Sequence, residues 1–421
     1  MTVRSPVHVL NLKKLMANVA RDRGQWRNLM RGLGGASAPV PDGVRTRLDE
    51  VHSFGTNPGN LRMFRYLPPR LAADAGLVVV LHGCTQTAAG YDLGAGWSTL
   101  ADRYGFALLL PEQQRSNNPN GCFNWFQPGD IERGRGECLS IRQMIETMIM
   151  DNRIDPSRVF ITGLSAGGAM TSVMLACYPE VFAAGAIIAG LPYGVATNVQ
   201  QAFESMHRCP TRSAHAWGNL VRAASPHRGR WPRVSIWHGS ADKTVIPGNA
   251  QETLKQWIDV HGLALLPAVR AKVDGYPREA WVNESGETLI ESFTVTHMAH
   301  GTPLATGTAD GKCGAAGPFL LEVGISSSYH IAKFFGLAQP LDRSAAAGTL
   351  ATVQRPQIQR LTPAESRALR EDLDQKEPAS AAKPTEAPRV DPRVDPRVDT
   401  GVDIGAIITK ALTAAGLMKA P

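Results

Sequence analysis

The stretch VFITGLSAGGAM, residues 159–170, decides the fold. Its first four residues are apolar or β-branched and predict a buried strand, while the small and apolar residues from Ala166 onward predict a helix. Between them lies Gly-x-Ser-x-Gly, the pattern of a tight strand-to-helix turn that presents a serine hydroxyl at the edge of a sheet. Glycines at 163 and 167 let strand and helix approach closely. The alternative is an ordinary glycine-rich turn with no chemistry at Ser165.

Apolar runs of the same kind alternate with helix-like segments through the middle of the chain. We expect strands at 63–67, 77–81, 106–110, 159–162, 184–189, 234–237 and 291–295. We expect helices at 97–104, 140–150, 166–178 and 248–260. Continuous apolar strands suit a sheet covered on both faces. The predicted fold class is therefore α/β, with a mostly parallel sheet between two layers of helices.

Composition divides the chain into four segments. We expect a basic amphipathic N-terminal extension at 1–50, a catalytic domain at 51–340, a disordered Pro/Ala-rich linker at 341–400 and an amphipathic helix at 401–421. The linker repeats Pro-Arg-Val-Asp from 388 to 399, and proline at every fourth residue excludes a helix. The terminal segments suggest docking on a hydrophobic granule or a membrane surface, with packing on the domain itself as the alternative.

The distribution of charge and the cysteine pattern limit the kinds of partner and site that we expect. Residues 1–45 carry +6 of the formal net charge of +7, so the main domain is nearly neutral and no nucleic-acid partner is expected. The six cysteines include no Cys-x-x-Cys pair, so we expect neither a zinc ribbon nor a thioredoxin-type motif. We also expect no cofactor. The first 24 residues lack the apolar core of a secretory signal, which predicts a cytoplasmic protein with reduced thiols.

A serine nucleophile needs a base and an orienting carboxylate, which follow in the order Ser, Asp, His in folds of this kind. Asp242 lies just after the predicted strand 234–237, where such an acid belongs. Its alternative role is to stabilise a loop turn. His297 and His300 both follow the strand 291–295, and we favour His300 because a Gly-Thr-Pro turn follows it.

Two main-chain amides are candidates for an oxyanion hole. The apolar run 77–81 is followed by His82-Gly83-Cys84, and an amide at this place can act together with the amide that follows the nucleophile. These donors are Cys84 and Ala166. We expect His82 to have a structural role.

Three aromatic residues are candidates for a substrate-binding wall. They are Trp125, Phe126 and Tyr193, and plain core packing is the alternative for each of them. Cys84 and Cys122 could pair near the site if they lie close together, although a reducing cytoplasm argues against it.

Five segments together resemble one family. They are LHGCTQ (81–86), GCFNWF (121–126), GLSAGGAM (163–170), HGSAD (238–242) and MAHG (298–301). In these segments the chain resembles the polyhydroxybutyrate-depolymerase family of esterases, whose relatives include feruloyl and acetylxylan esterases. The resemblance covers roughly residues 50–338. It implies an α/β-hydrolase fold, a triad of Ser165, Asp242 and His300, an oxyanion donor at Cys84, no metal, and an extracellular location as an alternative.

The function expected from these observations is a serine carboxylester hydrolase. It would cleave poly(3-hydroxybutyrate)-type polyester or its oligomers through an acyl-enzyme. A carbohydrate esterase that removes feruloyl or acetyl groups is the nearest alternative. A non-catalytic granule- or surface-binding protein is an alternative of a different class.

Overall fold

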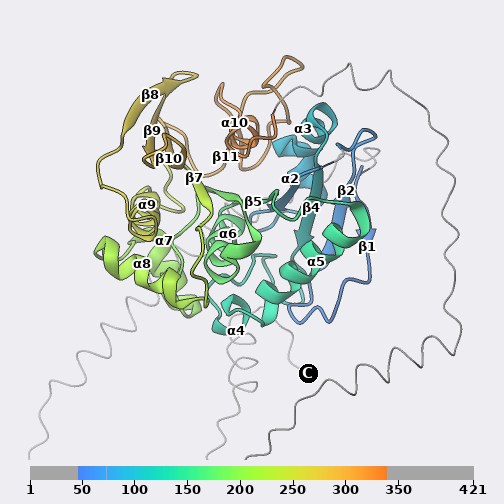
Figure 1. The fold of residues 1–421 in the computed structure, drawn as a ribbon, viewed down its shortest axis with the longest axis horizontal. Helices are drawn as coiled ribbons and strands as arrows, with labels where there is room; N and C mark the ends of the chain where they lie inside the picture. Colours follow the sequence, from blue (N-terminus) through green and yellow to red (C-terminus); the bar gives the residue numbers. More distant parts are fainter. Residues whose placement is uncertain (1–45, 73, 339–421) are drawn as a thin grey trace, which may run out of the picture. The chain divides into compact units, whose positions relative to one another are not determined.

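A ten-stranded sheet runs through residues 46–72 and 74–338, the part of the chain that the computed structural model describes (Figure 1). The expected linker and C-terminal helix, and the expected N-terminal extension up to residue 45, lie outside the described residues. None of the described helices is long and apolar enough to cross a membrane.

The middle of the sheet is parallel and its edges are antiparallel. The parallel strands are, in spatial order, β4 (Ala107–Glu112), β3 (Leu77–Leu81), β5 (Val159–Leu164), β6 (Ala184–Ile188), β7 (Arg233–Gly239) and β10 (Thr288–Val295). The antiparallel strands are β2 (Arg62–Tyr66) and β1 (Asp49–Val51) beyond β4, and β9 (Tyr276–Val282) and β8 (Val269–Val273) beyond β10. A two-stranded sheet pairs β11 (Thr302–Leu304) with β12 (Leu320–Glu322). Parallel strands end at one edge, so the loops after β3, β5, β7 and β10 lie on the same side of the sheet.

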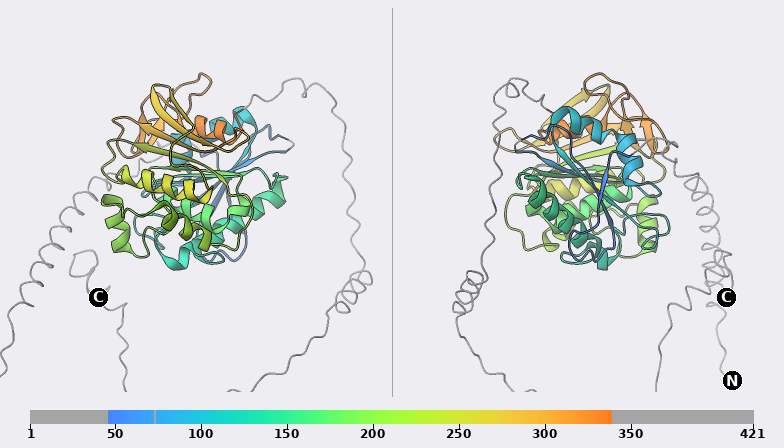
Figure 2. Two further views of the ribbon diagram at one scale, coloured as in Figure 1. Left: turned by 60° about the vertical axis from the view of Figure 1, so that its left-hand side comes forward. Right: turned by 90° about the vertical axis from the view of Figure 1, so that its right-hand side faces the viewer.

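Helices cover both faces of this sheet (Figure 2). Within β3, Leu77 and Val79 pack on one face, together with the buried residues of α5 (Gly136–Asn152), α6 (Ala166–Cys177), α8 (Ala214–Ala223) and α9 (Gly248–Val260). Val78 and Val80 pack on the other face, with α2 (Ala88–Ala95), α3 (Trp97–Tyr104) and α10 (Ser327–Phe334). The remaining helices are α4 (Pro128–Ile131), α7 (Val199–His207) and the 3₁₀ turn η1 (Pro179–Val181). All five residues of β3 are buried, which explains why an uninterrupted apolar run predicted it.

The predicted elements are confirmed. The strand at 77–81 and the helices at 97–104 and 248–260 have the bounds that the sequence predicted, and the others differ by a few residues at their ends. The antiparallel pair β8 and β9 was not predicted, because β8 is exposed and carries Arg270 and Lys272 in place of an apolar face. The sheet begins at Asp49, so Asp49 and Glu50 belong to the sheet although we expected them in the N-terminal extension.

Candidate active site

Ser165 lies on a strained turn between β5 and α6. Its φ of 57° and ψ of −115° are sparsely populated by residues other than glycine, and its amide donates to the Ile188 carbonyl at 2.9 Å. A Cβ at Gly163 would lie 2.4 Å from the Gly167 carbonyl carbon, and a Cβ at Gly167 would lie 2.3 Å from the Leu81 carbonyl oxygen. Both positions therefore require glycine. The side chains around Ser165 are buried, whereas Ser165 itself is partly exposed.

The loop after β7 and the loop after β10 bring Asp242 and His300 together. The amide of Ser240 donates to the Val295 carbonyl and that of Ala241 to the Met298 carbonyl, each at 3.0 Å. These two hydrogen bonds join the loops. Nδ1 of His300 lies 2.7 Å from Oδ2 of Asp242, and both side chains are buried. The other carboxylate oxygen, Oδ1, accepts the amides of Thr244 and Val245 at 2.9 Å. Asp242 therefore both stabilises its own turn and holds the imidazole of His300.

A second histidine also contacts this carboxylate. Nε2 of His238 lies 2.7 Å from the Val245 carbonyl oxygen and 3.4 Å from Oδ2 of Asp242. Because a carbonyl oxygen can only accept, that nitrogen carries a proton. Burial alone would raise the pKa of Asp242, but hydrogen bonds from His238 and His300 outweigh it and hold the pKa well below its usual range. Asp242 is therefore an ionised carboxylate at neutral pH. Within 46–72 and 74–338, no group of three or more His, Cys, Asp or Glu residues could hold a metal ion.

Ser165 and His300 share the carboxyl edge of the sheet. Ser165 follows β5 and His300 follows β10, and the strands β6 and β7 lie between β5 and β10 in the sheet. In the described part of the chain, the Ser165 hydroxyl makes no direct hydrogen bond to His300, and such contacts are often long when no substrate is bound. His297 lies elsewhere: its ring is exposed, and its amide donates to the Ser240 hydroxyl. Of the two competing histidines, the structure therefore brings only His300 to Asp242.

The two predicted oxyanion donors lie at adjacent chain segments. The close approach of Gly167 to the main chain of Leu81 and His82 places the first turn of α6 against the segment that leads to Cys84. The amides on either side of Cys84 are engaged: that of Gly83 donates to Oε1 of Gln86, and that of Thr85 donates to the Asn120 carbonyl. Among the described residues, the amides of Cys84 and Ala166 have no hydrogen-bond acceptor. These two N–H groups are therefore available to an incoming oxygen atom.

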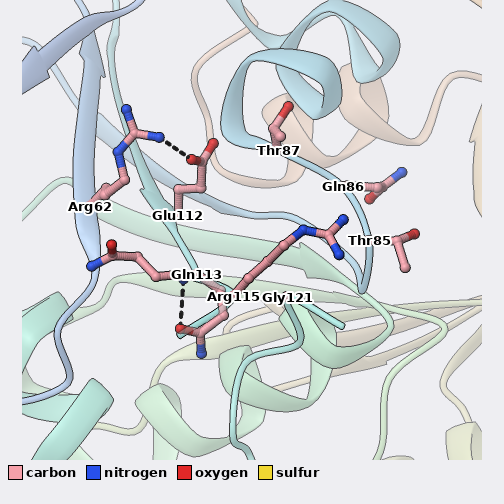
Figure 3. A pocket seen from close by; sticks show the side chains of 9 residues that line it. Arg62, Thr85, Gln86, Thr87, Glu112, Gln113, Arg115 and Gly121 are labelled. Atoms are coloured by element: carbon pink, nitrogen blue, oxygen red, sulfur yellow. Dashed lines mark hydrogen bonds and ion pairs between the residues drawn. The ribbon is translucent and has the colours of Figure 1, made fainter. Parts of the chain in front are cut away.

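A polar cavity of about 280 Å³ opens beside the Cys84 segment (Figure 3). Its wall includes Thr85 and Gln86 from one loop, Glu112 at the end of β4, and Arg115 and Gly121 from the loop that follows. None of the predicted site residues lines it, although Thr85 is the chain neighbour of Cys84 and Gly121 is that of Cys122.

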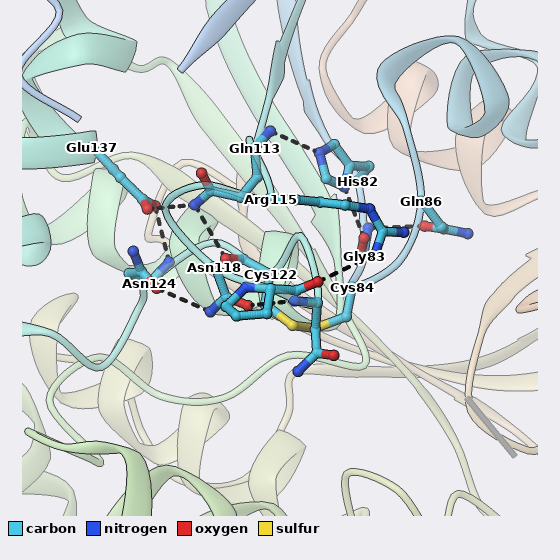
Figure 4. The surroundings of a disulfide bond; sticks show 12 residues. His82, Gly83, Cys84, Gln86, Gln113, Arg115, Asn118, Cys122, Asn124 and Glu137 are labelled. Atoms are coloured by element: carbon cyan, nitrogen blue, oxygen red, sulfur yellow. Dashed lines mark hydrogen bonds between the residues drawn. A yellow bond between two sulfur atoms is a disulfide. The ribbon is translucent and has the colours of Figure 1, made fainter. Parts of the chain in front are cut away.

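Cys84 and Cys122 form a disulfide, with their Cα atoms 4.2 Å apart (Figure 4). This contradicts the expectation of reduced thiols for this pair. That expectation rested on the compartment inferred from the N-terminus and not on geometry, which the sequence could not supply. The cross-link ties the segment that carries a candidate oxyanion donor to the loop that carries Trp125 and Phe126.

Buried polar residues also hold the two segments that the disulfide joins. The amide of Gln113 donates to Nε2 of His82, so the protonated Nδ1 donates to the Gly83 carbonyl at 2.7 Å. Burial lowers the pKa of His82, which is therefore neutral and structural, as the sequence predicted. Glu137 accepts the Gln113 side-chain amide and the Asn124 main-chain amide (Figure 4). Sequence reasoning missed Glu137, because its position in a helix gives no local signal of its partners.

The three candidate wall residues lie largely in the core. Trp125 and Phe126 are 7% and 9% exposed, and their rings meet edge to face with centroids 5.3 Å apart. Tyr193 is partly buried and packs against the core, and its main chain bonds to the side chain of Gln256. These contacts favour core packing, the alternative that the sequence left open for each residue.

The sequence is similar to those of known proteins. The model of the family "Esterase PHB depolymerase" matches residues 61–281. Poly(3-hydroxyalkanoate) depolymerase C of Paucimonas lemoignei is 50% identical over 291 residues, which cover 69% of this chain and 70% of that protein. Feruloyl esterase B of Neurospora crassa is 37% identical over 260 residues, which cover 60% of this chain and 87% of that protein.

A solved structure supports the same fold. The acetyl xylan esterase from Aspergillus awamori superposes with a TM-score of 0.59 at 29% sequence identity, over 69% of this chain and 99% of that one. The mostly parallel sheet, the serine turn after β5 and the late His–Asp pair are features of α/β-hydrolases. The chain therefore belongs to the Esterase PHB depolymerase family, and it is an α/β-hydrolase that cleaves carboxylic esters.

Proposed function

We propose that this enzyme hydrolyses a hydroxyalkanoate polyester or its oligomers, with Ser165 as nucleophile, His300 as base and Asp242 as orienting acid. The observation that carries the proposal is the 2.7 Å contact between Nδ1 of His300 and Oδ2 of Asp242, at the sheet edge where the strained turn presents Ser165. The 50% identity to a poly(3-hydroxyalkanoate) depolymerase supports the polymer as substrate class.

In the first step, His300 activates Ser165. Because Nδ1 of His300 donates to Asp242, its Nε2 is the unprotonated nitrogen and can accept the serine proton. The serine oxygen then attacks the ester carbonyl while the imidazole becomes a cation. The ionised carboxylate of Asp242 stabilises that cation and fixes the ring orientation.

The oxygen of the attacked carbonyl gains negative charge and needs donors that are already in place. The amides of Cys84 and Ala166 supply them, and the N-terminal end of α6 adds a partial positive charge. The disulfide holds the Cys84 amide in position. His300 then passes its proton to the leaving alcohol, which leaves an acyl group on Ser165.

Water completes the cycle. His300 takes a proton from a water molecule, which attacks the acyl-enzyme through the same oxyanion arrangement. The hydroxy acid leaves and Ser165 recovers its proton.

Replacing Ser165 by alanine tests the proposal. We expect Ser165→Ala to abolish turnover of a p-nitrophenyl ester and labelling by a fluorophosphonate probe, because both reactions need the serine oxygen. Ser157→Ala, a change of an exposed loop serine, is the matched control and should keep both. Turnover or labelling in the Ser165→Ala protein would refute the assignment. A wild-type protein that is inert in both assays would instead favour the alternative of a non-catalytic binding protein.

A substrate panel separates the polyester from the second candidate. The feruloyl esterase and the acetyl xylan esterase among the similar proteins favour a carbohydrate ester as that candidate. We expect kcat/KM to be higher for 3-hydroxybutyrate oligomers than for methyl ferulate or acetylated xylan oligosaccharides. The reverse order would reject the polyester and retain the carbohydrate esterase.

The disulfide supports an extracellular location, because such bonds persist in oxidising compartments. Binding to a polymer granule through residues 1–45 or 401–421 belongs to the same proposal. Deleting residues 401–421 should then lower granule binding without changing the turnover of a small ester. Equal granule binding by the shortened protein would contradict a role for that segment.

A further inference from the structure

The polar cavity beside Cys84 has three charged residues in its wall, Arg62, Glu112 and Arg115. Glu112, its only acidic wall residue, is fully engaged: Oε1 accepts Nη1 of Arg62 at 2.7 Å, and Oε2 accepts the amide of Ala88 at 2.8 Å. Arg62 is also bidentate to Glu50. The carboxylates on this side of the cavity therefore already have their partners.

Arg115 differs from Arg62 in this respect. It is exposed, and its guanidinium bonds only to the Pro119 carbonyl, at 3.2 Å, without an ion pair to any described residue. Its side chain extends from its loop toward the segment that carries Thr85 and Gln86 (Figures 3 and 4). A guanidinium with free N–H groups at the mouth of a polar cavity is suited to a carboxylate, which it binds in a bidentate, charge-assisted manner.

Two residues of the cavity wall are chain neighbours of the disulfide cysteines. Thr85 follows Cys84 directly, Gly121 precedes Cys122 directly, and the disulfide joins the two segments. The wall of the cavity is therefore continuous along the chain with Cys84, whose amide is the candidate oxyanion donor. At about 280 Å³ the cavity is near the lower end, roughly 300 Å³, of small-molecule sites, so it admits only a short chain end.

We infer that this cavity is a subsite for the terminal carboxylate of a hydroxy-acid oligomer, with Arg115 as its anchor. The inference rests on the proposed function, because it assumes that the substrate is an oligoester with a free carboxyl end. It adds a determinant that the catalytic residues do not provide: the enzyme distinguishes a chain that ends in a carboxylate from one that ends in an ester.

Binding is measured separately from turnover. In the Ser165→Ala protein, the trimer of 3-hydroxybutyrate and its methyl ester are titrated by calorimetry at low ionic strength. We expect the free acid to bind about tenfold more tightly than the methyl ester, since one charge-assisted contact distinguishes them. This preference should shrink in high salt, because the guanidinium is exposed.

Two variants in the same background locate the preference. Arg115→Gln should remove it. Arg228→Gln is the matched control and should keep it, because Arg228 is also exposed and also bonds to one main-chain carbonyl, outside the cavity. Equal affinity for acid and ester, no binding of the acid at millimolar concentration, or a preference that survives Arg115→Gln would each overturn the subsite. A binding preference without oligomer turnover in the wild-type enzyme would reject the proposed substrate and retain the subsite.

Discussion

Replacing Asp242 by asparagine separates the two roles of this side chain. Oδ1 accepts two main-chain amides of its own turn, and Oδ2 faces Nδ1 of His300. An asparagine can keep its oxygen at the Oδ1 position and so preserve the turn. Its NH₂ group then faces His300, and two donors cannot share one hydrogen bond. The imidazole must therefore carry its proton on Nε2, and a protonated Nε2 cannot accept the proton of Ser165.

The expected loss is large and specific to turnover. Holding the wrong histidine tautomer in a site of this kind costs about 10⁴-fold in kcat, or about 5 kcal/mol of transition-state stabilisation. If Asp242 only stabilised its loop, the variant would lose little activity, since the turn survives.

The stability of the fold also depends on the charge of Asp242. Because the pKa of Asp242 is depressed, its carboxylate stabilises the fold above the unfolded pKa, and this contribution is lost as the pH falls through the folded pKa.

The assay is kcat for a soluble p-nitrophenyl ester at neutral pH, measured on protein whose fold is verified by circular dichroism. Asp155→Asn is the matched control, because Asp155 accepts the amide and the hydroxyl of Ser157 in an exposed turn. The control should keep full activity. A folded Asp242→Asn enzyme with kcat within about tenfold of wild type would refute the triad reasoning, since it would leave Asp242 as a turn residue only.

Three further predictions concern the surroundings of the site. Replacing both Cys84 and Cys122 by serine should lower the free energy of unfolding by about 4 kcal/mol, because the cross-link spans 38 residues. Urea unfolding measures this loss, with Cys209→Ser, a change of a free cysteine, as the control. Equal unfolding midpoints for the double variant and the wild type would contradict the prediction. Burial and the charge of Asp130 raise the pKa of Glu137 from 4.5 to about 8, so wild-type stability should decline as pH rises through that window, and the decline should be missing in Glu137→Gln. Unfolding midpoints at several pH values test this, and parallel declines in both proteins would count against it. In Gly167→Ala the new Cβ would lie 2.3 Å from the Leu81 carbonyl oxygen, so α6 must move. A shift of about 1 Å should lower kcat by about 10²-fold. Gly129→Ala is the control and should keep kcat, because its Cβ would meet nothing within 4 Å. Full activity of Gly167→Ala would show that the close approach does not matter.

The parts of the fold that could be predicted are those whose signal is local. β3 and β5 are buried on both faces, so their apolar runs reveal them, and the turn at Ser165 needs glycines whose spacing is visible in the sequence. β8 could not be found in this way, since an exposed edge strand needs no apolar face. The short helix α4 is defined by its contacts and not by a periodic pattern.

The site was predicted unevenly for the same reason. The turn at Ser165 could be predicted from one segment alone. The sequence favoured His300 over His297 only because of the turn that follows it, and the contact of His300 with Asp242 is visible only in the structure. The contact of His238 with Asp242 needs β7 to turn back on itself, and it has no sequence signature. The disulfide was left open because two cysteines 38 residues apart carry no information on their distance.

The origin of the three proposed catalytic residues on β5, β7 and β10 has a consequence for how the molecule matures. These strands are far apart in the chain: β6 and the helices α6, α7 and α8 lie between β5 and β7, and α9, β8 and β9 lie between β7 and β10. A nascent or nicked molecule that lacks β10 would hold a serine without its base, and so would be chemically silent. Ester cleavage thus reports completion of the whole parallel core, and a premature or partly digested chain would not attack the esters around it.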